Sequence, residues 1–129
     1  MRKITIVLLA LVIMCGCTVS QSRQALLENP PCKKVFTVSK NYQEAYRIIV
    51  DRTKNCNSMW IVNYDSVDNQ LYTDIQKAEI ICDKHSVLLG ARTQFSIKVL
   101  ATGKNTSRVT ACYHRGYQKL MQDIQDMLQ

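Results

Sequence analysis

The sequence lacks the patterns that mark several common classes of protein. It has no G-x-S-x-G motif and no glycine-rich phosphate-binding motif, so α/β-hydrolase and nucleotide-binding chemistry have no support. It has no C-x-x-C pair, the spacing that zinc sites usually contain. It has no apolar run of the ~20 residues that a membrane-spanning helix needs. Internal repeats and low-complexity segments are absent as well.

The charge is basic but dispersed. The chain has 17 basic and 10 acidic residues, a net charge of +7, and without Arg2 and Lys3 it has 15 against 10, or +5. A nucleic-acid-binding protein is expected to cluster its basic residues among aromatics, whereas Lys33 and Lys34 are the one adjacent basic pair after the N-terminus. We therefore expect a solvated, mildly basic surface and no nucleic-acid partner; a weak attraction to anionic lipid headgroups is compatible with it.

The N-terminus resembles an export signal. Arg2 and Lys3 precede an apolar run at 4–14 in which only Thr5 is polar. This length suits the apolar region of a secretory signal and is too short to cross a bilayer.

The tripeptide before Cys17 resembles the bacterial lipobox, in which a small residue precedes a cysteine that is acylated. Gly16 supplies the small residue for Cys17, whereas Cys15 follows the bulkier Met14. We expect residues 1–16 to be removed as a signal peptide and Cys17 to carry the lipid, palmitate included. Thr18, rather than Asp, after Cys17 favours the outer membrane, facing the periplasm. The alternative is an ordinary soluble secreted protein.

Four cysteines then remain: Cys32, Cys56, Cys82 and Cys112. An even number in an exported chain predicts two disulfides, since the periplasm permits them and a small domain is stabilised by them. Three connectivities are open. As a guess we pair Cys56 with Cys82, because both could face the interior, and Cys32 with Cys112.

A metal or catalytic site is the competing hypothesis for these cysteines. The two histidines give the pairs Cys82-x-x-His85 and Cys112-x-His114. A Cys–His catalytic pair needs a free thiol, which a disulfide removes. We therefore expect no metal, no cofactor and no enzymatic activity.

The mature chain divides into a tether and one domain. Residues 17–31 are mostly polar and end in a proline pair, which predicts a lipidated N-terminus and a flexible tether. Residues 25–27 could form a short helical turn or a partner contact within it. Residues 32–129 are enough for a single domain.

The domain begins with a predicted strand at 35–39 and a helix from 42 to about 55. Asn41 and Glu44 have the spacing of a capping box. The apolar stripe of the helix recurs at intervals of three and four residues, at Tyr42, Ala45, Tyr46, Ile49 and Val50.

Further strands are predicted at 59–65 and 70–83, with a turn at 66–70, followed by a hairpin at 95–114. A closing helix has its apolar stripe at Tyr117, Leu120, Met121, Ile124, Met127 and Leu128. The class is thus α+β: an antiparallel sheet of about 4–5 strands with two helices on one face, in the order β-α-β-β-β-β-α. Residues 84–91 are either a contact loop or a further core strand, and we favour the core.

The motifs of residues 35–128 are similar to those of a family of small proteobacterial lipoproteins with no established activity. The resemblance is carried by the F-x-V strand of Phe36 and Val38, the helix with Tyr42 and Tyr46 ending near Cys56, and a strand before the last helix. That strand contains Val109 and Tyr113. The resemblance implies the fold and transfers no catalytic residue.

These features predict a non-catalytic lipoprotein that is an accessory or interaction module of a cell-envelope complex. Its expected partners are the membrane, through the lipid, and an unknown envelope protein. The alternative is an inhibitor or sensor that binds a foreign hydrolase or an envelope ligand. The sheet face with Ser96, Lys98, Thr110 and His114 is expected to be solvated or to meet a partner, and an edge strand at 35–39 could accept a partner's strand.

Overall fold

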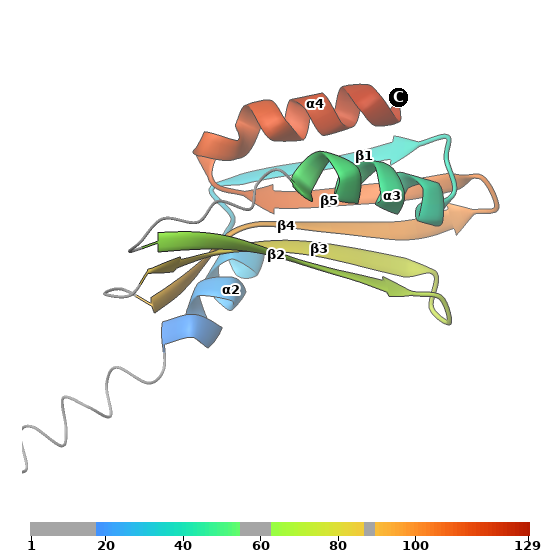
Figure 1. The fold of residues 1–129 in the computed structure, drawn as a ribbon. Coiled ribbons are helices and arrows are strands. Elements are labelled where there is room, and N and C mark those ends of the chain that lie inside the picture. Colours follow the sequence, from blue (N-terminus) through green and yellow to red (C-terminus); the bar gives the residue numbers. More distant parts are fainter. Residues whose placement is uncertain (1–17, 55–62, 87–89) are drawn as a thin grey trace, which may run out of the picture.

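Five antiparallel strands form one sheet in the spatial order β1-β5-β4-β3-β2, with helices on both of its faces (Figure 1). The computed structural model describes residues 18–54, 63–86 and 90–129. The strands are β1 (Cys32–Val38), β2 (Asn63–Tyr72), β3 (Lys77–Ser86), β4 (Gly90–Gly103) and β5 (Thr106–Tyr113). The helices are α2 (Thr18–Glu28), α3 (Tyr42–Thr53) and α4 (Gln118–Leu128), with the 3₁₀ turn η3 (Arg115–Tyr117) before α4.

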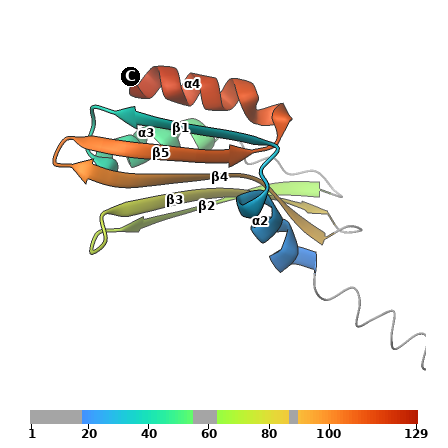
Figure 2. The same ribbon diagram turned by 180° about the vertical axis from the view of Figure 1, so that it is seen from behind.

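The α+β class and the order β-α-β-β-β-β-α are confirmed for the chain from β1 onwards. Helices α3 and α4 cover one face of the sheet, as predicted. Helix α2 lies on the opposite face, and both views show it there (Figures 1 and 2).

Helix α2 replaces most of the predicted tether. The prediction of a flexible segment at 17–31 is wrong over Thr18–Glu28, because these residues are helical and α2 packs against β4 and β5. Leu26 is buried in this contact. Pro30 and Pro31 then separate α2 from β1, since proline cannot continue a helix. A polar composition did not predict this helix because one buried leucine and a few polar contacts are enough to dock it.

The apolar core lies between the sheet and helices α3 and α4. Alternate residues of the central strands point into it, as the sequence predicts for the hairpin of β4 and β5. Val99 pairs with Val109, and Ile97 pairs with Ala111. The strand residues of this core are Ala78, Ile80 and Cys82 from β3, Phe95, Ile97 and Val99 from β4, and Val109, Ala111 and Tyr113 from β5.

Helix α3 begins as the capping box predicts. The side-chain oxygen of Asn41 accepts a hydrogen bond of 2.9 Å from the backbone N–H of Glu44, which satisfies one of the unpaired N–H groups of the first turn. Ala45 and Ile49 are fully buried. The helix ends at Thr53, about two residues before the predicted end.

Helix α4 buries Met121, Ile124 and Leu128 but leaves Met127 49% exposed. The assignment of Met127 to the apolar stripe is therefore wrong. It precedes Leu128 directly, and a step of about 100° around the helix turns it away from the sheet.

The turn between β2 and β3 is later in the chain than predicted. Residues 66–70 continue the ladder with β3, from Ser66 opposite Asp83 to Gln70 opposite Glu79, and the turn follows at 73–76. Gln76 has φ 51°, and its carbonyl accepts a bond of 3.0 Å from the N–H of Ala101. Polar residues are tolerated at 66–70 because β2 is an edge strand. The predicted strand at 59–65 lies mostly outside the described residues, and its last part begins β2.

The segment 84–91, for which a further core strand is favoured, lies partly outside the described residues. Lys84–Ser86 end β3, Gly90 and Ala91 begin β4, and 87–89 lie outside the described residues. Of the helices in the described ranges, none combines the length and the hydropathy that a membrane crossing requires.

The core predicts a contrast between two aliphatic residues of β4. Ile97→Ala is expected to lower the free energy of unfolding by about 2–5 kcal/mol because Ile97 is fully buried, whereas Leu100→Ala, at 45% exposure, should cost less than about 1 kcal/mol. Urea unfolding followed by circular dichroism measures both. Equal losses for the two variants would contradict this placement of the core.

Candidate functional site

The predicted cysteine sites are only partly brought together. Cys17 and Cys56 lie outside the described residues, so the lipidation of Cys17 and the Cys56–Cys82 pairing stay predictions. Cys82 is buried in the core facing α3. Cys32 and Cys112 have free thiols. The guessed bond between them does not form, because Cys112 is opposite Lys33, and the neighbouring Cys32 therefore points to the other face of the sheet.

Neither of the two Cys–His pairs forms a joint site. Cys82 and His85 are three residues apart on β3, so their side chains lie on opposite faces. The Nε2 of His85 is 2.7 Å from the Oγ of Ser66. Cys112 and His114 share a face but line different pockets. Across the described ranges, no group of three or more His, Cys, Asp or Glu side chains is placed to hold a metal ion.

Helix α2 is docked on the sheet by a buried carboxylate that the sequence did not reveal. The Oδ2 of Asp83 accepts a hydrogen bond of 2.9 Å from the Nη2 of Arg23, and its Oδ1 accepts one of 2.7 Å from the hydroxyl of Thr93. Asp83 is 8% exposed and Thr93 is 3% exposed. Each carboxylate oxygen thus has a donor, which offsets the cost of burying the charge.

A register shift in the sheet brings Asp83 and Thr93 opposite each other. Cys82 pairs with Phe95, but the next residue, Asp83, pairs with Thr93, so Gln94 is an extra residue on β4. Such a bulge re-aims the side chains around it. The polar residues 83 and 93 therefore lie under α2, while Cys82 and Phe95 stay in the core.

A pocket of about 280 Å³ lies where α2 meets the end of β5. His114 and Arg92 line it together with Leu26 of α2. Burial lowers the pKa of His114 below its usual value, and the positive charge of Arg92 lowers it further, against an opposing effect of a hydrogen bond with the Thr93 backbone. Both the burial and the charge of Arg92 thus favour the neutral form of the imidazole.

On the other face, Tyr113 lies in the core with Cys32 opposite it across β1 and β5. Burial raises the pKa of the Tyr113 phenol, and coulombic interaction with Cys32 raises it further. This tyrosine stays protonated at neutral pH and acts as a packing residue.

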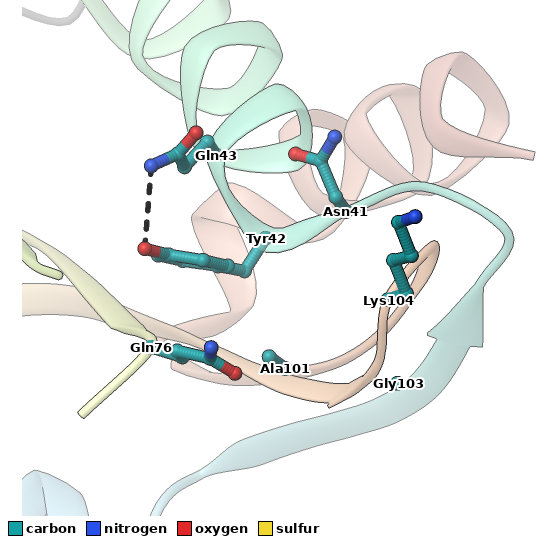
Figure 3. A pocket seen from close by; sticks show the side chains of 7 residues that line it. All are labelled: Asn41, Tyr42, Gln43, Gln76, Ala101, Gly103 and Lys104. Carbon is teal, nitrogen blue, oxygen red and sulfur yellow. Dashed lines mark hydrogen bonds between the residues drawn. The ribbon is translucent and has the colours of Figure 1, made fainter. Parts of the chain in front are cut away.

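A second pocket, of about 590 Å³, opens at the other end of the sheet, and we refer to it as the end pocket (Figure 3). It lies between the start of α3, the β2–β3 turn and the β4–β5 hairpin. Its lining residues are Asn41, Tyr42, Gln43, Gln76, Ala101, Gly103 and Lys104.

The end pocket is lined mostly by neutral polar side chains. Lys104 is its one charged lining residue among those described, and the Asn41 side chain already caps α3. The Tyr42 hydroxyl accepts a 3.3 Å hydrogen bond from the Gln43 amide, and Figure 3 shows these two side chains facing each other. Its lining therefore offers amide and hydroxyl groups and the amine of Lys104, and Tyr42 and Lys104 are of residue types that can take part in general acid–base chemistry.

Comparison with known proteins gives little further information. No protein-family model matches the chain, and no curated protein matches it either. A solved structure of a conserved protein from Geobacillus kaustophilus is 8% identical, with a TM-score of 0.36 over 74% of this chain and 85% of that chain. A point mutant of Thalictrum flavum norcoclaurine synthase, in complex with a transition state analogue, is 9% identical, with a TM-score of 0.32 over 71% and 80%. Likenesses this distant carry no argument about function.

The contact between Arg23 and Asp83 predicts the stability of the docked helix. Arg23→Gln removes the charged partner of a nearly buried carboxylate, so we expect a loss of about 1 kcal/mol, discounted for the exposure of Arg23. Amide hydrogens at 24–28 should exchange faster. The control Lys40→Gln breaks a longer, more exposed pair with Glu44 and should change stability by less than about 0.5 kcal/mol. Unchanged exchange at 24–28 would refute the docking role.

The environment of His114 predicts a dependence of stability on pH. Because its pKa is lowered in the folded chain, the unfolded chain takes up the proton first as the pH falls. The stabilisation of the folded chain by neutral His114 is therefore fully present above the unfolded pKa of about 6.5 and declines as the pH falls below it. We expect His114→Gln to flatten the change in melting temperature between about pH 7.5 and about pH 5.5, and Arg92→Gln to flatten it partly. A slope in His114→Gln equal to that of the wild type would count against this assignment.

Proposed function

We propose that the protein is a non-catalytic lipoprotein, anchored to a bacterial envelope membrane through Cys17, that serves as an interaction module of an envelope complex. The anchor follows from the lipobox-like segment before Cys17. The non-catalytic role is supported by the placement of Cys82 and His85, whose side chains lie on opposite faces of β3.

One observation supports this function most directly: helix α2 begins at Thr18, the residue after Cys17. The lipid would be joined to a helix that is itself docked on the sheet through Leu26 and Arg23. A helix of 11 residues is roughly 16 Å long. A flexible tether of residues 18–31 could instead extend to about 50 Å. The domain is thus held near the bilayer with one side towards it, an arrangement suited to contact with other membrane-bound components.

The lipidation of Cys17 is tested by the mass of the full chain recovered from the membranes of its own host. We expect the mass of residues 17–129 plus acyl chains. Cys17→Ser should abolish the acyl mass and move the protein out of the membrane fraction. The matched control is Cys15→Ser, which changes a cysteine that leaves with the signal and should retain the lipid.

Two results would overturn the proposal. One is an unacylated chain in the membrane fraction of the wild type. The other is acyl mass that survives Cys17→Ser but is lost in Cys15→Ser, which would place the lipid on the other cysteine.

A further inference from the structure

Helix α2 covers only part of its sheet face, and basic and aliphatic side chains are exposed on the remainder. We call this surface the basic face. It consists of the outward-pointing residues of the strands beyond α2: Lys33, Val35 and Thr37 of β1, Arg108 and Thr110 of β5, Lys98 and Leu100 of β4, Lys77 and Glu79 of β3, and Asp68, Gln70 and Tyr72 of β2. The opposite, inward-pointing residues of the same strands form the core.

The pairing register places these residues in rows across the sheet. One row runs from Val35 through Thr110 and Lys98 to Glu79, and the next contains Arg108 and Leu100. Because paired residues of an antiparallel sheet lie on the same face, the basic side chains of distant strands become neighbours.

Charge is distributed unequally between the two sides of the molecule. The basic face has four basic residues against two acidic ones, a net charge of +2. Helices α3 and α4 together have three basic residues against four acidic ones, a net charge of −1. The basic face is thus more positive than the layer formed by α3 and α4.

Two of the basic residues are partly neutralised, and two are not. Glu79 is 3.0 Å from the Nζ of Lys77 and 3.8 Å from that of Lys98. Within the described part of the chain, no ion pair involves Lys33 or Arg108, and both are exposed. The charge available to a partner therefore lies towards the β1 edge.

Exposed apolar side chains gather among these cations. Leu27 of α2 is 40% exposed, Val35 is 53% exposed and Leu100 is 45% exposed. Leu27 lines a shallow pocket with Lys33 and Lys98, which places the helix residue at the border of the basic face. Aliphatic residues surrounded by long basic side chains suit the interface of a bilayer, where apolar stems enter the headgroup layer and charges meet phosphates.

We propose that the basic face lies against the anionic headgroups of the membrane that holds the anchor. This inference rests on the proposed lipidation of Cys17. Helix α2 is on the same side of the sheet as the basic face, and α2 begins at the residue that follows Cys17 (Figures 1 and 2). The lipid and the basic face would together fix the orientation of the domain, with α3 and α4 away from the bilayer.

The experiment uses lipidated full-length protein reconstituted in two kinds of vesicle. One is made of phosphatidylcholine alone, and the other of equal parts of phosphatidylcholine and phosphatidylglycerol. A water-soluble amine-reactive reagent labels lysines, and peptide mass spectrometry measures the rate at each one. On anionic vesicles we expect slower labelling of Lys33 and Lys98 than on neutral vesicles. Lys54, which follows α3, and Lys119, which belongs to α4, should react at equal rates on the two kinds of vesicle. Raising the ionic strength to about 1 M, where the Debye length is about 3 Å, should remove the protection.

A matched pair of triple variants separates the basic face from net charge. Each basic side chain at an anionic surface contributes roughly five-fold to the docking equilibrium, so Lys33→Gln/Lys98→Gln/Arg108→Gln should weaken it by about 100-fold. Protection of Lys77 should then be lost. The control Arg47→Gln/Lys54→Gln/Lys119→Gln removes the same charge from the other side and should leave Lys77 protected.

The possible failures are distinguishable. A mass spectrum of the reconstituted protein without acyl chains would refute the anchor alone. With the lipid present, equal labelling of Lys33 and Lys98 on both kinds of vesicle would overturn the membrane contact. Protection that appears in native membranes but in neither kind of pure vesicle would also overturn it, because the basic face would then be covered by an acidic protein.

Discussion

The alternation of residues along β4 is the constraint on which the rest of the structure depends. Phe95, Ile97 and Val99 point to one face of the sheet, and Ser96 and Lys98 point to the other. An apolar face must be covered, and the amphipathic helices α3 and α4 cover it. The polar face has no such requirement. Helix α2 can therefore dock there by specific contacts over part of the face and leave the remainder exposed.

The contacts of α2 are of a different kind from those of the core. Leu26 supplies the apolar part, while Arg23 and Thr93 hold the Asp83 carboxylate from both sides. Such a network is directional, so it fixes the position of the helix more than it adds to its stability. If Cys17 carries a lipid, the fixed position of α2 on the sheet also restricts how the whole domain is oriented relative to the membrane. The neutral His114 beneath the same helix adds a dependence on pH to that docking.

The sequence predicted the elements whose residues alternate or recur strongly. The hairpin of β4 and β5, the capped helix from Asn41 and the stripe of α4 were found because burial is regular in them. It missed α2, because Leu26 is a single buried apolar residue in a polar segment. It placed a turn at 66–70 because edge strand β2 carries turn-forming residues in its ladder. The polar pair Asp83 and Thr93 could not be found from sequence, since a bulge at Gln94 sets its register. Of the candidate site residues, Cys82 and His85 are three residues apart on one strand, so alternation along the strand already implied opposite faces. The separation of Cys32 from Cys112 depends on the register of β1 and β5, which the sequence does not contain.

The open edges of the sheet bear on where a protein partner would bind. Strand β1 is an edge, but Lys33 and Lys34 point to its two faces, and the Nζ of Lys34 donates to Gln122 of α4 at 2.6 Å. Charged residues on an edge strand disfavour the addition of another strand. With Lys33 at the bilayer and α4 alongside Lys34, β1 would be shielded on both faces. The layer of α3 and α4 and the end pocket would then remain accessible from the aqueous side. If an envelope partner binds on that side, the end pocket presents to it amide and hydroxyl groups and the amine of Lys104, the one charged residue in its described lining.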